Sequence, residues 1–257
     1  MGLFGKVFEK KQCSICGGDI GLLGNRKLED GNMCKECASK LSPFFSDRRS
    51  STVEEIEQQL AYREENKEAV KQFHTTRTIG ENMKLLLDED ARKFIVTRSR
   101  NLEDANPDVI NYSDVTGVDF KIDEDKSEEK REDKDGNKVS YNPPKFIFEY
   151  DFHITIHVNN PYFDTISYQL NPSAVRTNED NPLPMNQKPN ERQNREYQEY
   201  EKMGNDIKNV LTAARQEARQ ERESAAAPKT PVICPLCGAT TIPTPAGTCE
   251  YCGGPVK

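Results

Sequence analysis

The sequence predicts an α+β protein with a small cysteine-rich module at each end of the chain. Three observations lead to this fold class. All eight cysteines fall into four C-x-x-C pairs, two near the front of the chain and two at its end. Residues 145–158 alternate apolar and polar side chains with the period of a half-buried strand. Residues 191–223 carry the spacing of a long, charge-dense helix.

Composition limits the size of the core and the kinds of partner. Hydrophobic residues make up 34% of the 257 residues, charged residues make up 31%, and tryptophan is absent. We therefore expect a modest core with much solvated helix and loop. The formal net charge of −7 provides no general attraction to polyanions. No apolar run predicts a transmembrane helix or a signal peptide, so we expect a cytoplasmic protein with its cysteines reduced.

Residues 1–12 are predicted to be a short apolar and basic leader. It is either a peripheral membrane anchor or a segment that docks on its own protein, and we favour the second because one or two helical turns bind a bilayer weakly. Lysine at position 6 excludes N-myristoylation of the Met-Gly start, which needs serine or threonine there. The apolar and basic side chains are Leu3, Phe4, Val7, Phe8, Lys6, Lys10 and Lys11.

Residues 13–50 are predicted to be the first metal module. A C-x-x-C turn presents two thiolates from one bend, and Zn²⁺ prefers four soft ligands in a tetrahedron. Between the two pairs, which are seventeen residues apart, residues 26–33 predict a hairpin, and the second pair is expected to open a helix through Leu41. Together these parts indicate a treble-clef-like zinc finger. Its expected ligands are Cys13, Cys16, Cys34 and Cys37.

Residues 51–80 are predicted to be a helical connector. Two overlapping capping boxes, beginning at Ser51 and Thr52, mark the helix start, and the helix is expected to run to about Phe73. Its apolar stripe is broken, so we expect it to pack on one side only. The stripe consists of Val53, Ile56, Leu60, Val70 and Phe73.

Residues 81–188 are predicted to be an antiparallel β domain. Residues 84–87 and 93–97 flank an acidic turn and predict a hairpin, and residues 109–112 and 115–122 predict two further strands.

The clearest strand covers residues 145–158, and residues 163–170 are predicted to return beside it. Because the outgoing strand is longer, its first half must pair elsewhere, as in small barrels and sandwiches. Residues 123–138, which are almost without hydrophobic side chains, predict a solvated loop or an extended hairpin tip. Residues 171–190 are rich in asparagine and proline and predict a linker or long loop.

Residues 189–227 are predicted to contain the long charged helix. Its seam could form a coiled coil. We favour packing across the strand domain, because Gly204 and an alanine-only end make a weak coiled-coil seam. The seam consists of Tyr197, Tyr200, Gly204, Ile207, Leu211, Ala214 and Ala218.

Residues 228–257 are predicted to be a zinc ribbon, two similar knuckles joined by a short loop. Segments this small cannot fold on apolar burial alone, so the metal decides whether they fold. A thioredoxin-like redox site would need one pair in a βαβ setting, and a catalytic zinc would need an open position. Two matched sets of four favour two structural Zn²⁺ sites. The expected ligands of the rear site are Cys234, Cys237, Cys249 and Cys252.

The three histidines do not suggest a further metal site. His153 and His157 share one strand face but are separated by roughly 13 Å of extended chain. His74 is isolated after the predicted helix. The sequence also contains no Gly-rich phosphate loop, nucleophile elbow or paired catalytic carboxylates, so we do not expect an enzyme.

The front module resembles a known bacterial family. The runs CSICGGDIGLL from Cys13 and KLEDGNMCKEC from Lys27, with LSPFF from Leu41 and STV from Ser51, are similar to the DUF4428 family, a zinc-finger domain of unknown function. The resemblance covers about residues 12–60 and implies a bacterial protein with four zinc ligands and no known activity. The strand region followed by a long helix resembles a bacterial pleckstrin-homology-like (PH-like) domain in layout alone.

These patterns lead to one main functional hypothesis and two alternatives. The main hypothesis is a non-catalytic, zinc-binding adaptor that binds protein partners in the bacterial cytoplasm. The first alternative is nucleic-acid binding through the zinc modules, whose front member is mildly basic. The second is membrane association through residues 1–12, alone or with a lipid-binding β domain. The basic side chains of the front module are Arg26, Lys27, Lys35, Lys40, Arg48 and Arg49.

Overall fold

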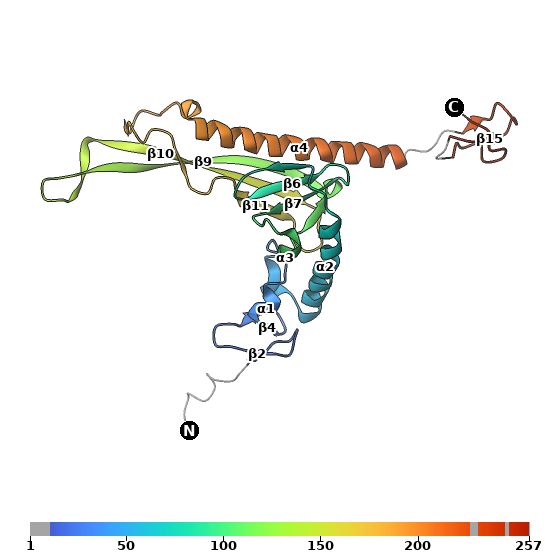
Figure 1. Cartoon of the computed structure of the whole chain (residues 1–257), viewed down its shortest axis with the longest axis horizontal. Helices are drawn as coiled ribbons and strands as arrows, with labels where there is room; N and C mark the ends of the chain where they lie inside the picture. Colours follow the sequence, from blue (N-terminus) through green and yellow to red (C-terminus); the bar gives the residue numbers. More distant parts are fainter. Residues whose placement is uncertain (1–10, 227–230, 245–246, 257) are drawn as a thin grey trace, which may run out of the picture. The chain divides into compact units, whose positions relative to one another are not determined.

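The structure, a computed structural model, describes residues 11–226, 231–244 and 247–256. Helices and several antiparallel sheets confirm a mixed α and β architecture (Figure 1). The chain divides into two compact units, one ending at Arg215 and one beginning at Gln216. Of the predicted leader, residues 1–10 lie outside the described residues. No helix in the described ranges combines the length and apolar character needed to cross a bilayer.

The front module consists of two small hairpins and a short helix. The hairpin predicted between the cysteine pairs is present, and the helix opens at the second pair as predicted. It ends at Ala38 rather than Leu41, because Pro43 restricts the backbone before it and the next hydrogen bonds span three residues. The elements are β1 (Lys11–Gln12) with β2 (Asp19–Ile20), β3 (Arg26–Lys27) with β4 (Asn32–Met33), α1 (Lys35–Ala38) and the 3₁₀ turn η1 (Asp47–Ser50).

Helix α2 (Val53–Gln72) begins where the capping box predicts. The Glu55 N–H donates to the Thr52 hydroxyl at 3.2 Å, and the Thr52 N–H donates to the Glu55 carboxylate at 2.8 Å. The predicted apolar stripe was only partly right, because the buried face between Ile56 and Val70 is polar. On that face Arg63 and Asn66 bond polar side chains and backbone carbonyls, and Gln59 is buried beside them.

A buried polar cluster joins the front module, α2 and the residues just before strand β8 (Val109–Asn111). We call it the Arg63 junction (Ser42, Arg63, Asn66, Asn106 and Asp108). The Arg63 guanidinium donates to Asp108 at 2.7 Å, and the two side chains are 6% and 0% exposed. The Ser42 hydroxyl donates to the other Asp108 oxygen at 2.8 Å, while Asn66 bonds Asn106 and the Pro107 carbonyl. Burial raises the pKa of Asp108, and Arg63 and Ser42 oppose that rise.

A four-stranded antiparallel sheet follows α2 in the order β5-β6-β7-β8. The predicted hairpin is confirmed as β6 with β7, and consecutive residues Leu85–Leu87 and Phe94–Val96 are buried, so both faces of this sheet are covered. The elements are β5 (Arg77–Ile79), β6 (Lys84–Asp88), β7 (Lys93–Thr97), the short helix α3 (Leu102–Ala105), β8 (Val109–Asn111) and η2 (Tyr112–Asp114).

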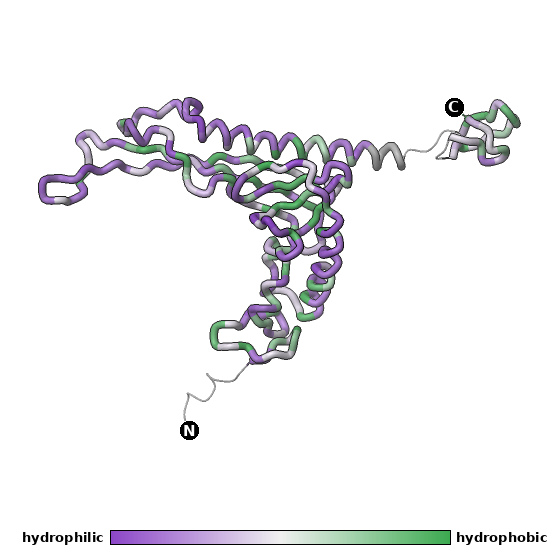
Figure 2. Tube along the Cα trace, in the orientation of Figure 1, coloured by the Kyte–Doolittle hydropathy of each residue, from purple (hydrophilic) through white to green (hydrophobic). Residues whose placement is uncertain are grey.

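The second sheet is built on one long hairpin, β9 (Val115–Glu132) with β10 (Lys138–Val158). Alternate β10 residues from Phe148 to Val158 are buried, as the period-two pattern predicts. Both strands extend well beyond the predicted 115–122 and 145–158. Residues 123–138 are therefore the far part of a hairpin and not a loop, and Figure 2 shows that part as hydrophilic.

Residues 171–190, predicted to be a linker or long loop, form a loop that carries two short strands. This segment runs along β10 and pairs with it through β12 (Val175–Arg176) and β13 (Leu183–Pro184), beyond the returning strand β11 (Thr165–Gln169). Two asparagine side chains, one before β12 and one after it, bond the β10 backbone. The Phe152 N–H donates to Asn171 and the Phe148 N–H donates to Asn178, each at 2.8 Å. The first half of the long strand thus finds its partner here.

Helix α4 (Arg195–Ala226), preceded by η3 (Glu191–Gln193), packs on the β9–β10 sheet as predicted (Figure 1). Tyr197 forms edge-on ring contacts with Tyr150 and Phe152, and Ile207 and Leu211 are fully buried in the same core. That core also receives side chains from the four-stranded sheet.

Gly204 lets α4 approach β9 closely. A Cβ built at this glycine would lie 2.1 Å from the Phe120 ring. The glycine in the predicted seam is therefore a contact residue, and the seam from Tyr197 to Ala214 faces the sheet.

The rear module is a small antiparallel hairpin with a bridge beyond it. β14 (Val232–Ile233) pairs with β15 (Thr240–Thr241), and Thr248 bridges to Pro255. The buried hydrophobic residues of this module are Cys234, Cys249 and Val256. Its hydrophobic core is thus formed largely by two of its own cysteines.

Candidate metal centres

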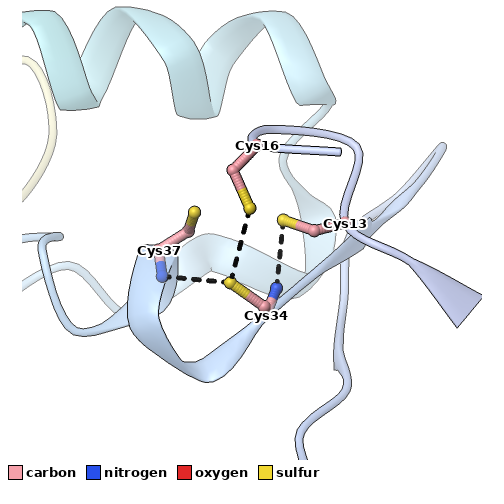
Figure 3. A group of neighbouring side chains, drawn as sticks. All are labelled: Cys13, Cys16, Cys34 and Cys37. Atoms are coloured by element: carbon pink, nitrogen blue, oxygen red, sulfur yellow. Dashed lines mark hydrogen bonds between the residues drawn. The ribbon is translucent and has the colours of Figure 1, made fainter. Parts of the chain in front are cut away.

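The front cluster brings four thiols from one turn and one helix to one point. Cys13 and Cys16 lie on the turn between β1 and β2, Cys34 is the N-cap of α1, and Cys37 lies within that helix (Figure 3). All four Sγ atoms lie within 4.8 Å of one another. Cys13 and Cys37 are buried, whereas Cys16 is exposed.

Backbone N–H groups point at these sulfurs. The Cys34 N–H donates to Cys13 Sγ at 3.2 Å, and the Cys37 N–H donates to Cys34 Sγ at 3.3 Å (Figure 3). Although burial opposes ionisation, backbone N–H groups of Cys16 and Cys34 lower the pKa of Cys13 to about 6. Burial and the neighbouring sulfurs raise the pKa of Cys37. The cluster therefore contains one thiol that ionises more readily than an ordinary cysteine.

The rear cluster also brings four thiols together, but the backbone that holds them differs from that of the front cluster. Its four Sγ atoms also lie within 4.8 Å of one another. Burial opposes the ionisation of Cys249, but the N–H groups of Cys252 and Tyr251 lower its pKa to about 6. The Gly254 N–H lowers the pKa of Cys252, but the sulfurs of Cys237 and Cys234 outweigh it and raise this pKa to about 12.

Three of the four C-x-x-C pairs share one backbone design. In each, the N–H of the residue after the second cysteine donates to the carbonyl of the first, at 2.8–2.9 Å. That residue is a glycine with φ of +70° to +73°, a conformation that only glycine adopts at no steric cost. The glycines are Gly17, Gly238 and Gly253. The fourth pair, Cys34 and Cys37, opens α1 instead, so the front cluster combines a knuckle with a helix and the rear cluster combines two knuckles.

The donor set fits a tetrahedral zinc ion. A Zn–S bond of about 2.3 Å places two ligand sulfurs about 3.8 Å apart in a tetrahedron. The sulfur pairs measure 3.9 Å for Cys16 with Cys34, 3.6 Å for Cys234 with Cys252 and 3.7 Å for Cys237 with Cys249. Each cluster can therefore hold one metal ion, and four thiolates complete its coordination without an open position.

The histidines lie apart from both clusters. His157 pairs with Asp119 at 2.9 Å, and His153 approaches Asp123 at 3.6 Å, both on the face of β10 opposite the core. His74 lies in the segment after α2. Among the residues that the structure describes, no group of metal-binding side chains includes a histidine.

A cleft lies between the end of the front module and the turn after β10, which sequence reasoning missed. Its volume is about 780 Å³. Phe44 packs against Phe163 with ring centroids 5.6 Å apart, and the charged lining residues are all acidic. They are Asp47, Glu55 and Asp164. The sequence could not place residues 44–58 beside residues 160–165, because the segments are about a hundred residues apart.

Comparison with known proteins identifies only the front module. Residues 11–59 match the family model described as a domain of unknown function (DUF4428). This match confirms the resemblance seen in the sequence and includes all four cysteines of the front cluster. No curated protein matches the chain, and no solved structure does. The function must therefore be argued from the site itself.

Proposed function

We propose that this protein is a non-catalytic zinc-binding adaptor of the bacterial cytoplasm, with two structural Zn²⁺ ions. The observation that carries the proposal is the pair of closed four-cysteine clusters, whose sulfur spacing fits tetrahedral zinc. A closed site leaves no position for a substrate or an activated water. We also propose that the front module is a treble-clef-like finger and that the rear module is a zinc ribbon. The β domain with α4 is, in this proposal, a PH-like domain.

The adaptor function needs a surface for a protein partner, and we assign it to the acidic cleft. Aromatic rings supply apolar contact area, and three carboxylates with no basic lining residue suit a segment that carries lysine or arginine. Asp47 lies in the 3₁₀ turn that follows the front module's helix, so metal-dependent folding of that module also orders one wall of the cleft.

Affinity capture from a native bacterial lysate, with the full zinc-loaded chain as bait, tests this function. An Asp47→Lys/Asp164→Lys variant reverses the charge of the cleft and should lose a partner that the wild-type chain retains. Glu128→Lys, a change in the far part of the β9–β10 hairpin, is the matched control and should retain that partner. If no partner distinguishes the cleft variant from the control, this assignment is wrong.

A further inference from the structure

The turn between β2 and β3 exposes two leucines that have no role in the fold. The Gly24 N–H donates to the Gly21 carbonyl at 2.9 Å, which closes a tight turn around Leu22 and Leu23. Leu22 is 85% exposed and Leu23 is 90% exposed, whereas Leu28 in the same module is fully buried. Central turn positions favour glycine, proline, asparagine, aspartate and serine. An apolar pair here therefore has no local structural reason and is free to meet a ligand.

One basic side chain folds back on this turn, and a second contacts the backbone just after it. Arg26 donates to the Leu23 and Asn25 carbonyls, each at 3.3 Å, and Arg48 donates to the Lys27 carbonyl. Among the described residues, no carboxylate forms an ion pair with the four side chains of this basic group. We call it the arginine group: Arg26, Lys27, Arg48 and Arg49.

The positive charges of the arginine group lie close enough to repel one another, so the group forms one continuous basic surface. Burial lowers the pKa of Arg48, and the positive charges of Arg26 and Arg49 lower it further. Arg49 follows Arg48 in η1, and Arg48 contacts the backbone one residue after Arg26, so the three charges lie near one another. A cluster of unpaired cations attracts an anionic surface.

The described chain begins beside this turn. Strand β1 pairs with β2 so that Lys11 lies opposite Ile20, one residue before the turn begins. The chain therefore enters the module beside the turn. The sequence that precedes Lys11 contains Leu3, Phe4, Val7, Phe8, Lys6 and Lys10.

We propose that the Gly21–Gly24 turn inserts into the interface of an anionic lipid bilayer. Leu22 and Leu23 enter the boundary of the acyl chains, and the arginine group contacts the anionic headgroups. This combination fits lipid better than nucleic acid, since aliphatic side chains gain nothing from phosphate or from base stacking. The inference goes beyond the adaptor function and does not depend on it, because the acidic cleft takes no part.

A unique fluorophore can test insertion directly. The chain contains no tryptophan, so Leu23→Trp introduces the only one. With the full zinc-loaded chain, we expect its emission to shift to the blue and to be quenched by lipids brominated on the acyl chain. Vesicles of phosphatidylcholine with phosphatidylserine should produce both effects, and pure phosphatidylcholine should not. An emission that anionic vesicles leave unchanged would overturn the proposal.

Co-sedimentation with the same vesicles tests the contribution of the two leucines. Leu22→Ser/Leu23→Ser should weaken partitioning by at least about tenfold, because two large apolar side chains no longer leave water. Met185→Ser removes an apolar side chain that is 65% exposed elsewhere and should bind as the wild type does. Higher salt should weaken wild-type binding, because it screens the arginine group.

Two controls distinguish insertion of the turn from loss of folding and from binding by the preceding segment. Bound zinc per chain should be equal in all variants, because both leucines are exposed and contact nothing that the fold needs. Phe4→Ser/Phe8→Ser in the full chain reports on the preceding segment. The proposal fails if that variant loses vesicle binding while the double-serine turn variant retains it. It also fails if the chain binds generic RNA or DNA but not the vesicles.

Discussion

At the scale of single residues, the Arg63 junction should dominate the stability of the first unit. Replacing Arg63 by methionine leaves the fully buried Asp108 carboxylate without its cation. Removing one partner of such a pair costs about 3–5 kcal/mol. We expect urea unfolding of Arg63→Met to show a loss in that range. The exposed pair of Lys67 with Glu64 provides the control, and Lys67→Ala should change the free energy of unfolding by less than about 1 kcal/mol.

The same junction predicts how the stability that Arg63→Met loses depends on pH. Burial raises the folded-state pKa of Asp108, so the folded state binds this proton more tightly than the unfolded state does. Stability from the protonated carboxyl is therefore present at low pH and is lost as pH rises through the folded pKa. Without the opposing charge of Arg63, that pKa rises further.

We therefore expect the difference in unfolding free energy between wild type and Arg63→Met to be smaller at about pH 5 than at about pH 7. The comparison at each pH is made with equal zinc content. If Arg63→Met lowers the free energy of unfolding equally at both pH values, the ionised Asp108 carboxylate is not the cause of the loss.

At the scale of elements, the contact of α4 with β9 depends on Gly204. Alanine normally stabilises a helix interior by about 1 kcal/mol relative to glycine. Here the new methyl group would meet the Phe120 ring, and such overpacking costs about 1–3 kcal/mol. We expect Gly204→Ala to lower the midpoint of thermal unfolding. Asn209→Ala, an exposed change in the same helix, should leave that midpoint unchanged or raise it.

The segment after β11 provides a second test at this scale. Asn171 is 2% exposed and bonds the β10 backbone at the Phe152 N–H and the Tyr150 carbonyl. Asn171→Ala leaves these groups unsatisfied, which costs about 1–3 kcal/mol for a buried group. We expect faster amide exchange at Phe152 and a lower free energy of unfolding. The exposed Asn186→Ala serves as control. An equal effect of both changes would mean that the hydrogen bonds of Asn171 to the β10 backbone do not stabilise the sheet.

These elements show what the sequence could predict and where it could not. The core half of β10 was predictable because a buried and a wet face impose alternation. For the far part of the hairpin the sequence left a loop and a hairpin tip as alternatives, since both faces are wet there and Lys126, Glu128 and Lys130 replace apolar residues. The 171–190 segment has loop composition, yet Asn171 and Asn178 supply the strand's hydrogen bonds from their side chains. Likewise, the cysteine spacing predicted both clusters, but nothing local predicted that Arg63 would meet Asp108.

At the scale of the whole molecule, two structural metal ions should support two separately folded units. Native mass spectrometry should find two Zn²⁺ per wild-type chain, and one for either Cys37→Ser or Cys249→Ser. Structural zinc contributes about 10–16 kcal/mol in finger peptides, so each module should unfold without its ion. Losing the front zinc and losing the rear zinc should affect the rest of the chain differently. The front module, unlike the rear one, is joined to α2 and the β8 segment by the Arg63 junction.

Hydrogen exchange can separate these consequences. In Cys37→Ser, unfolding of the front module removes Ser42 and the Lys40 carbonyl from their contacts with Asp108 and Arg63. Exchange should then quicken through the middle of α2 and at residues 106–109. Cys249→Ser changes the other compact unit and is the matched control. It should quicken exchange in residues 231–244 and leave α2 as in the wild type. If α2 stays protected in Cys37→Ser although that chain holds only one zinc, the junction does not transmit the loss of the metal.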